Sequence, residues 1–214
     1  MDTSLFDHLA SARESRDRLY AVAVGVVTNN QDPDGLGRVK VKFPWLSDTD
    51  ESFWARVATP MAGKDRGLYL LPEVDDEVLV AFEHGRVEFP YILGALWNGK
   101  DKPPESNGDG KNNKRTLKSR SGSIIRLDDT EGAEKIEIID KTGKNAITFS
   151  SADNTIAIKA DADITIQSNN GKVKLMGQGI EISSQAEVKI EASSTADLKA
   201  SGTTTIKGAT VNIN

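Results

Sequence analysis

The sequence predicts an all-β protein in which a small N-terminal barrel is followed by a long shaft of short strands. Three observations predict this class. Apolar residues recur at i, i+2 spacing, which places two side chains on the same face of a strand. Gly, Asn, Asp and Ser lie between these pairs and supply short turns. The apolar period is 2 and not 3.6, so a helical interpretation fails for the repeated part of the chain.

Composition divides the 214 residues into five segments. Residues 1–18 are predicted to form a short polar helix or arm, with Asp2 or Thr3 as the N-cap. Residues 19–98 are rich in β-branched and aromatic residues and are assigned to the barrel. Residues 99–115 have the Pro, Gly and Asn content of a linker. Residues 116–134 are assigned to a neck, and residues 135–214 to the shaft.

Six short strands are expected in the barrel. Residues 38–43 and 77–82 alternate apolar and polar side chains, as half-buried strands do. The connection 29–37 carries Gly35 and Gly37, where a positive φ suits glycine. So many strands within about 80 residues, without an intervening helix, are typical of a closed Greek-key barrel of the oligonucleotide/oligosaccharide-binding (OB) type. The expected strands are 20–28, 38–43, 53–58, 67–71, 77–83 and 91–96.

From residue 135 onward, pairs of apolar residues separated by one residue recur about every eight positions. Each strand buries only one narrow stripe, so neighbouring units must complete its core, as in a solenoid or fibre. Two alternatives stay open, an antiparallel meander with short hairpins and a single-chain β-solenoid. A final pair, Val211 and Ile213, is expected at the far end of the shaft. The residues expected in the shaft core are Ile136, Ile138, Ile147, Phe149, Ile156, Ile158, Ile164, Ile166, Val173, Leu175, Ile180, Ile182, Val188, Ile190, Leu198 and Ile206.

Composition also limits the classes of function. A net charge of −5 argues against non-specific binding to nucleic acid, so no nucleic-acid partner is expected. The absence of cysteine excludes disulfides and thiolate metal sites. The lack of cysteine also suits assembly in a reducing cytoplasm, and neither an apolar run of transmembrane length nor a secretory signal is apparent. Six basic residues from Lys111 to Arg126, directly followed by four acidic ones, are interpreted as a solvated or mutually paired charged neck.

Four motifs follow one another between residues 32 and 99: DPDGLGRVKVKFPW from residue 32, WARVATP from residue 54, LPEVDDEVLVAF from residue 71 and FPYILGALWNG from residue 89. In this order and spacing they resemble the barrel of the VgrG and phage baseplate protein V family of spike proteins. The repeat after residue 135 is similar to the shaft of the same family. The residues that carry the barrel resemblance are Gly37, Arg38, Phe43, Pro44, Trp45, Trp54, Arg56, Val57, Pro72, Glu77, Val78, Phe82, Pro90, Gly94 and Trp97.

The resemblance implies the central spike of a contractile injection system, either a phage tail, a type VI secretion system or a related phage-like particle. Members form homotrimers whose shafts intertwine, with one strand from each chain in every layer of a three-sided β-prism. The barrel is then expected below a trimeric hub that joins the spike to the inner tube. The resemblance also implies transient contact with the target membrane. The expected location is the baseplate of a virion or injection particle, with delivery into the target envelope on firing.

The chain departs from the family at several places. Only about 18 residues precede the first expected strand, so a separate hub protein is expected at the barrel end. Residues 99–115 leave no room for the lysozyme domain that some spikes carry. The family's usual glycine before Glu77 is Asp75 here, which puts that turn in doubt. At the C-terminal end, either a separate conical tip protein of the PAAR type docks on Val211 and Ile213, or the tip is blunt.

The residues point to no enzymatic chemistry, and no catalytic residue, cofactor or metal ion is expected. The two histidines, His8 and His84, form no ligand pattern, and His84 is expected in an exposed turn. No Gly-x-Ser-x-Gly sequence marks a nucleophile. The run 107–113 lacks the bidentate glutamate of a calcium loop and is assigned to the linker.

Two other classes of function stay open. Trp45, Trp54 and Trp97 could stack on bases, as aromatic residues of such barrels do, which predicts salt-dependent binding of single strands. Packing in the core or at a trimer interface is the favoured role for these tryptophans. The third class is a glycan-binding or glycan-cleaving phage β-helix, which predicts depolymerase activity or retention of a specific saccharide.

Overall fold

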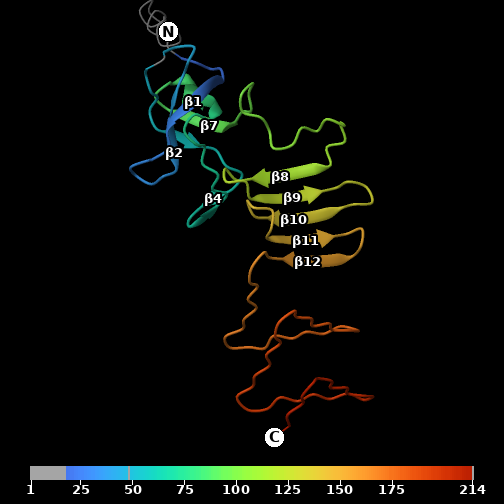
Figure 1. Ribbon diagram of the computed structural model, residues 1–214. Helices are drawn as coiled ribbons and strands as arrows, with labels where there is room; N and C mark the ends of the chain where they lie inside the picture. Colours follow the sequence, from blue (N-terminus) through green and yellow to red (C-terminus); the bar gives the residue numbers. More distant parts are fainter. Residues whose placement is uncertain (1–17, 48, 214) are drawn as a thin grey trace, which may run out of the picture. The chain divides into compact units, whose positions relative to one another are not determined.

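The structure is a computed structural model that describes residues 18–47 and 49–213. Within the described residues the regular elements are short β-strands and one 3₁₀ turn, and the last strand ends at Lys159 (Figure 1). The helix or arm predicted for residues 1–18 lies outside the described residues, apart from its last residue. The chain divides into two compact units, residues 1–161 and residues 162–214, which are described separately below. No helix among residues 18–47 and 49–213 combines the length and the apolar character that a membrane span requires.

Five strands of the first unit close into a barrel, which confirms the predicted all-β, OB-like architecture of this part (Figure 1). The order around the barrel is β1-β2-β3-β7-β6. Neighbouring strands are antiparallel except β3 and β7, which run parallel, and the pairing of β1 with β6 closes the sheet. The strands are β1 (Ala23–Asn29), β2 (Arg38–Lys42), β3 (Ala55–Val57), β6 (Glu77–Phe82) and β7 (Pro90–Ala95).

The barrel core consists of small aliphatic side chains that alternate along the strands. In β2, Val39 and Val41 are fully buried, whereas their neighbours Arg38, Lys40 and Lys42 are half-buried. The period of 2 therefore places every second side chain inside, as the sequence pattern predicts. The core cluster comprises Val27, Val39, Val41, Ala55, Val78, Val80 and Ile92, with Phe43, Val57, Leu71 and Phe82 packed against it.

One expected barrel strand is not present. Instead of a strand over residues 67–71, the chain forms a small hairpin of β4 (Ala62–Gly63) and β5 (Arg66–Gly67). Residues 68–71 carry no strand pairing, although Leu71 still packs against the barrel core. The prediction is wrong here because a run of apolar side chains has the composition of a strand, whereas the hairpin beside it pairs only two residues on each side.

The turn before β6 keeps its conformation without the family's glycine. Asp75 has a φ of +75°, in the left-handed region that favours glycine. Its backbone N–H donates to the Val27 carbonyl at 2.9 Å, and the Asp76 carboxylate accepts the Glu73 N–H at 2.8 Å. These bonds tie the turn to β1 and close it. The doubt that the sequence raised about this turn is therefore resolved, because aspartate adopts the glycine conformation.

The first unit also contains a five-stranded antiparallel sheet with the order β12-β11-β10-β9-β8 (Figure 1). Its strands are β8 (Lys114–Lys118), β9 (Ile124–Asp128), β10 (Lys135–Ile139), β11 (Ala146–Ser150) and β12 (Thr155–Lys159). The sheet crosses the predicted boundary between linker and neck, because β8 begins at Lys114 and ends at Lys118. It also crosses the boundary between neck and shaft, because β9 lies in the neck and β10 in the shaft. Strand pairing joins the neck to the first part of the expected shaft as one sheet.

Local hairpins build this sheet. The Asp140 carboxylate accepts the N–H and the hydroxyl of Thr142 at 3.2 and 2.8 Å and the amide group of Asn145 at 3.0 Å, and this closes the turn between β10 and β11. The Thr142 hydroxyl lowers the pKa of the Asp140 carboxyl, with further lowering by Asn145. Residues 135–159 therefore form the antiparallel meander that was the less favoured alternative, because each turn lets a strand pair with its neighbour in the same chain.

The second unit shows a different behaviour. No strand pairing is found over residues 162–213, and every one of these residues is exposed. The apolar pairs of the repeat lie on exposed segments here, and within the described residues they pack against no strand of the same chain. The predicted intertwined β-prism needs partner chains, and it stays a prediction.

Candidate functional site

The first barrel motif folds around one carboxylate. The Asp32 side chain is 3% exposed and accepts the N–H groups of Asp34, Leu36 and Arg38 at 3.0 to 3.2 Å. The Arg38 guanidinium donates to both carboxylate oxygens and also to Asp34. The Arg38 hydrogen bond holds the pKa of the Asp32 carboxyl well below its usual range. Gly37 adopts a φ of +69° between the donors Leu36 and Arg38, a conformation that glycine adopts without strain.

The three tryptophans lie in different environments. Trp54 is half-buried beneath two cations, with the Arg38 Cζ 5.9 Å and the Lys40 Nζ 5.6 Å from its ring centroid. Trp45 contacts Phe43 at 5.9 Å between ring centroids but is 58% exposed, and Trp97 is 69% exposed. Of the two predicted roles, packing in the barrel core does not apply to Trp45 and Trp97. Both indoles are open to solvent in a single chain. Their role at a trimer interface stays a prediction.

Most other motif residues hold the barrel together. Val78 is fully buried, Val57 and Phe82 pack against the core, and Phe43 contacts Phe82 at 5.8 Å. Arg56 lies over the Tyr91 ring at 5.5 Å. Pro72 and Pro90 are buried, Glu77 is half-buried, and Pro44 and Gly94 lie nearer the surface. The motif residues therefore specify the barrel and do not converge on one pocket.

One face of the five-stranded sheet is almost completely apolar. The register aligns Leu117, Ile125, Ile138, Ile147 and Ile158 across the five strands. A second row on the same face contains Leu127, Ile136, Phe149 and Ile156, and begins with Arg115. Eight of these nine apolar side chains are 40% to 67% exposed. Arg115 is the one charged residue of the two rows, and Asp129 pairs with it.

The opposite face carries Ile124 and Ile139 in one row, but its other rows are mainly polar and contain ion pairs. Thr116, Arg126 and Glu137 are aligned across β8, β9 and β10. Arg126 pairs with Glu137 at 3.6 Å and with Glu105 at 2.8 Å. Together with the pairing of Arg115, these contacts support the mutually paired interpretation of the neck. Sequence reasoning missed Glu105, because no local pattern indicates a partner 21 residues away.

The shaft residues of the second unit are all on the surface. Ten side chains of the expected shaft core are between 51% and 79% exposed: Ile164, Ile166, Val173, Leu175, Ile180, Ile182, Val188, Ile190, Leu198 and Ile206. At the end of the chain Val211 is 48% and Ile213 is 86% exposed. Apolar exposure on this scale is typical of an interaction surface.

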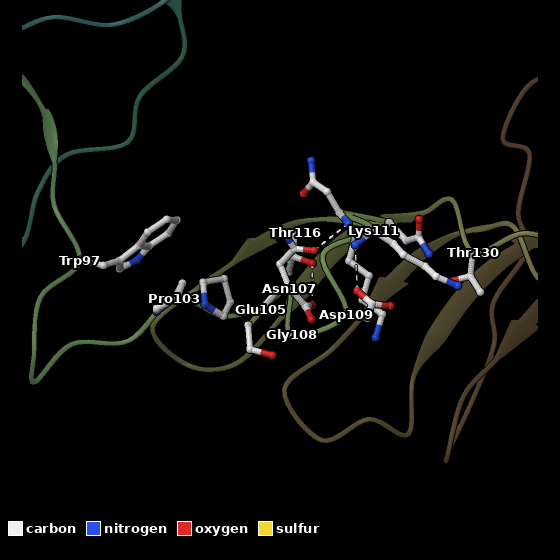
Figure 2. Close-up of a pocket in the computed structure, with 14 residues that line it drawn as sticks. Trp97, Pro103, Glu105, Asn107, Gly108, Asp109, Lys111, Thr116 and Thr130 are labelled. Atoms are coloured by element: carbon white, nitrogen blue, oxygen red, sulfur yellow. Dashed lines mark hydrogen bonds between the residues drawn. The ribbon is translucent and has the colours of Figure 1, made fainter.

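An open cleft of about 680 Å³ is lined by Trp97, by parts of the segment 103–116 and by Thr130. Figure 2 shows Trp97 and Pro103 on one side of this cleft, with Asn107, Asp109 and Lys111 on the other. Asn107 accepts the Asn112 N–H at 2.6 Å, and Asp109 accepts the Lys111 N–H at 3.1 Å, so both side chains stabilise their own loop.

Two further expectations about individual sites can be compared with the geometry. Within residues 18–47 and 49–213, no three His, Asp or Glu side chains form a group that could hold a metal ion. His84 lies in the exposed 3₁₀ turn η1 (Glu83–Gly85) between β6 and β7, with a φ of +49°. The prediction of an exposed turn residue is therefore confirmed.

Comparison with known proteins agrees with the barrel motifs. Residues 23–97 match the model of the type VI secretion system/phage-baseplate injector OB domain. The chain is similar to the type VI secretion system spike protein VgrG1a of Pseudomonas aeruginosa, at 33% identity over 129 residues, which are 55% of this chain and 20% of VgrG1a. It is also similar to the spike protein VgrG3 of Vibrio cholerae, at 29% identity over 156 residues, 69% of this chain and 15% of VgrG3.

The chain thus spans a fifth or less of the length of these two relatives. An alignment of 156 residues is longer than the barrel match of residues 23–97, so the similarity to VgrG3 includes residues outside the barrel. The closed five-stranded barrel agrees with the family that the motifs predicted. Residues 23–97 therefore form a barrel that matches the type VI secretion system/phage-baseplate injector OB domain, and the chain is similar to VgrG spike proteins over more than half of its length.

Proposed function

We propose that this protein is the central spike of a contractile injection system, a homotrimer that pierces the target envelope when the sheath contracts. The role is structural and involves no catalysis. The observation that carries the proposal is the apolar surface that one chain leaves open on the β8–β12 sheet and along residues 162–213.

Burial of apolar surface is worth about 25 cal/mol per Å², so a surface of this extent strongly favours association. Copies of the same chain fit it best, because the i, i+2 repeat continues in regular steps and offers each copy the same stripe. Three copies packed around one axis bury these stripes against one another. The closed prism then leaves no lateral sheet edge, and backbone hydrogen bonds between chains make it stiff.

The two ends of the spike meet different partners in this proposal. The barrel binds a separate trimeric hub protein that joins the spike to the inner tube. At the other end, three copies of Val211 and Ile213 form a small apolar platform for a conical tip protein of the PAAR type. The trimer assembles in the cytoplasm, resides in the baseplate of a virion or injection particle, and enters the target envelope on firing.

Light scattering on the purified full chain tests the central claim. A mass near three times 23.1 kDa is expected, whereas a mass near 23.1 kDa would refute the trimer and favour a single-chain β-solenoid. Purified particles from a producing strain test the role. The protein should be present in baseplates, and particles without it should lose their effect on target cells.

A further inference from the structure

The segment that joins the barrel to the five-stranded sheet, residues 98–113, is hereafter called the strap. Its Pro, Gly and Asn content is typical of a flexible linker. In the structure, however, both of its ends form hydrogen bonds to neighbouring strands or turns, and at the barrel end the Asn98 amide donates to the Glu77 carboxylate of β6 at 3.5 Å. The Asn98 side chain also accepts the N–H groups of Lys100 and Asp101 at 2.8 and 2.7 Å, which closes the first turn of the strap itself. At the other end, the Asn113 carbonyl accepts the Asp129 N–H at 2.8 Å.

Between these ends, Glu105 attaches the strap to the polar face of the sheet. Its Oε1 accepts the Thr116 hydroxyl of β8 at 2.8 Å and an Arg126 Nη2–H of β9 at 2.8 Å. The Arg126 Nε–H donates to the same threonine oxygen at 3.3 Å, so the three side chains form a closed triangle. The side chains of Glu105 and Arg126 are only 25% and 21% exposed, and this limits competition from water.

Arg126 has a second acidic neighbour, the Glu137 of β10. Glu137 is 8% exposed, and its Oε2 accepts no hydrogen bond although Arg126 Nη1 lies 3.6 Å away. Lys135 lies 3.0 Å from the other oxygen of the same carboxylate. Burial of the charged Glu137 carboxylate is unfavourable unless a positive charge lies nearby. This attraction holds the Arg126 guanidinium next to Glu137 on the sheet. Glu105 therefore contacts a guanidinium that the sheet itself already holds.

The electrostatic environment keeps Glu105 ionised at neutral pH. The Thr116 hydroxyl, followed by the charges of Arg126 and Lys114, lowers the pKa of the Glu105 carboxyl. A charged acceptor forms a stronger hydrogen bond than a neutral one. Ionisation of Glu105 therefore strengthens its hydrogen bonds with Thr116 and Arg126.

We propose that Glu105 is a positioning residue that clamps the strap to the sheet, so that the barrel and the shaft are joined by a rigid coupling. This inference rests on the proposed spike function, in which force from the tube passes along the chain to the tip. A free Gly- and Asn-rich segment would bend under compression. A strap fixed at both ends and in its middle transmits the force to the sheet instead.

Limited trypsin digestion of the full chain, in the oligomeric state in which it purifies, tests the clamp. Lys100 and Lys111 are cleavable sites on either side of Glu105, whereas Lys102 is followed by proline. The substitution Glu105→Gln keeps the shape of the side chain and removes its charge. It should speed cleavage at both lysines on the order of tenfold, the change expected from loss of a charge-assisted contact. Asp109→Asn is the matched control, since the bond that the described residues give Asp109 is to the Lys111 N–H within the strap, and an asparagine oxygen can still accept it.

Hydrogen exchange separates a clamp from a general stabiliser of the sheet. In Glu105→Gln, amides of residues 99–113 should exchange faster while those of β10 and β11 stay unchanged. Equal cleavage of both proteins, or faster exchange throughout the sheet, would overturn the clamp. Light scattering on the same samples keeps the two proposals apart, because selective release of the strap in a monomeric protein would support the clamp and contradict the trimeric spike.

Discussion

The guanidinium of Arg38 donates two hydrogen bonds to the carboxylate of Asp32, from Nε to Oδ2 at 2.8 Å and from Nη2 to Oδ1 at 2.7 Å. The same carboxylate accepts three backbone N–H groups of the loop between β1 and β2. The pair therefore determines the loop conformation and also places Arg38 against Trp54.

Replacing Asp32 by Asn should lower the melting temperature of the barrel by about 5 °C or more, because the amide cannot serve both arginine donors and the three backbone donors as an ion does. The three tryptophans, Trp45, Trp54 and Trp97, belong to the barrel motifs, so their fluorescence reports this transition. Asp34→Asn is the control. The Asp34 side chain is 66% exposed, and a shift of less than about 2 °C is expected.

The effect of Asp32→Asn should also depend on pH. Pairing lowers the pKa of Asp32 in the folded state. A carboxyl with a depressed folded pKa contributes its full stability above the unfolded pKa of about 3.9, and loses it as the pH falls through the folded value. The difference in melting temperature between wild type and Asp32→Asn should therefore be constant from about pH 5 to 7 and shrink below about pH 4. A difference that grows on acidification would contradict the pairing.

The barrel core predicts a large contrast between two neighbouring residues of β7. Ile92 is fully buried, whereas Leu93 is 47% exposed on the other face of the strand. Ile92→Ala should lower the free energy of unfolding by about 2–5 kcal/mol, because it leaves a cavity in a closed barrel. Leu93→Ala should lower it by less than about 1 kcal/mol. Urea unfolding followed by tryptophan fluorescence gives both values, and equal losses would show that the faces of β7 are misassigned.

The turn at Asp75 predicts opposite effects of two substitutions at one position. Its φ of +75° is costly for a β-branched residue, so Asp75→Val should lower the free energy of unfolding by about 1–2 kcal/mol. Asp75→Gly should leave it unchanged or raise it slightly, because glycine adopts this φ freely. The same urea experiment measures both variants. If Asp75→Gly proves the more destabilising of the two, the turn does not have this backbone conformation.

Much of the barrel could be predicted from sequence, for a physical reason that its strands illustrate. In β2 and β6 alternate burial leaves a direct trace in the order of apolar and polar residues, and the observed bounds differ from the predicted ones by one residue at one end. The hairpin of β4 and β5 has only two residues in each strand, which is too short for a periodic signal. The apolar run at residues 68–71, in contrast, has the composition of a strand, which is why the sequence predicts a strand over residues 67–71, although residues 68–71 form none.

The polar network was harder to predict, because its contacts join residues that are distant in the chain. Glu105 lies 11 residues from Thr116 and 21 residues from Arg126, and its surroundings resemble a linker in composition. Likewise, the i, i+2 pairs predict strands but do not reveal whether the partner strand belongs to the same chain. In β10 to β12 the short hairpin turns make neighbouring strands of the same chain the partners. Over residues 162–213 the structure shows no strand pairing within the chain.

The apolar face of the sheet leads to a last prediction that separates assembly from folding. Thr155 and Ile156 are adjacent residues of β12, and the register places Ile156 beside Phe149 on the apolar face and Thr155 beside Ser150 on the other. Both are exposed in a single chain, so aspartate at either position should leave the fold of that chain intact. In a trimer, however, Ile156→Asp would bring three charges close to one axis without partners, which is strongly unfavourable. Ile156→Asp should therefore reduce the mass found by light scattering to that of one chain, whereas Thr155→Asp should keep the trimer mass. Circular dichroism confirms that both variants stay folded, and an unchanged trimer mass for Ile156→Asp would show that this face of the sheet does not meet the other copies.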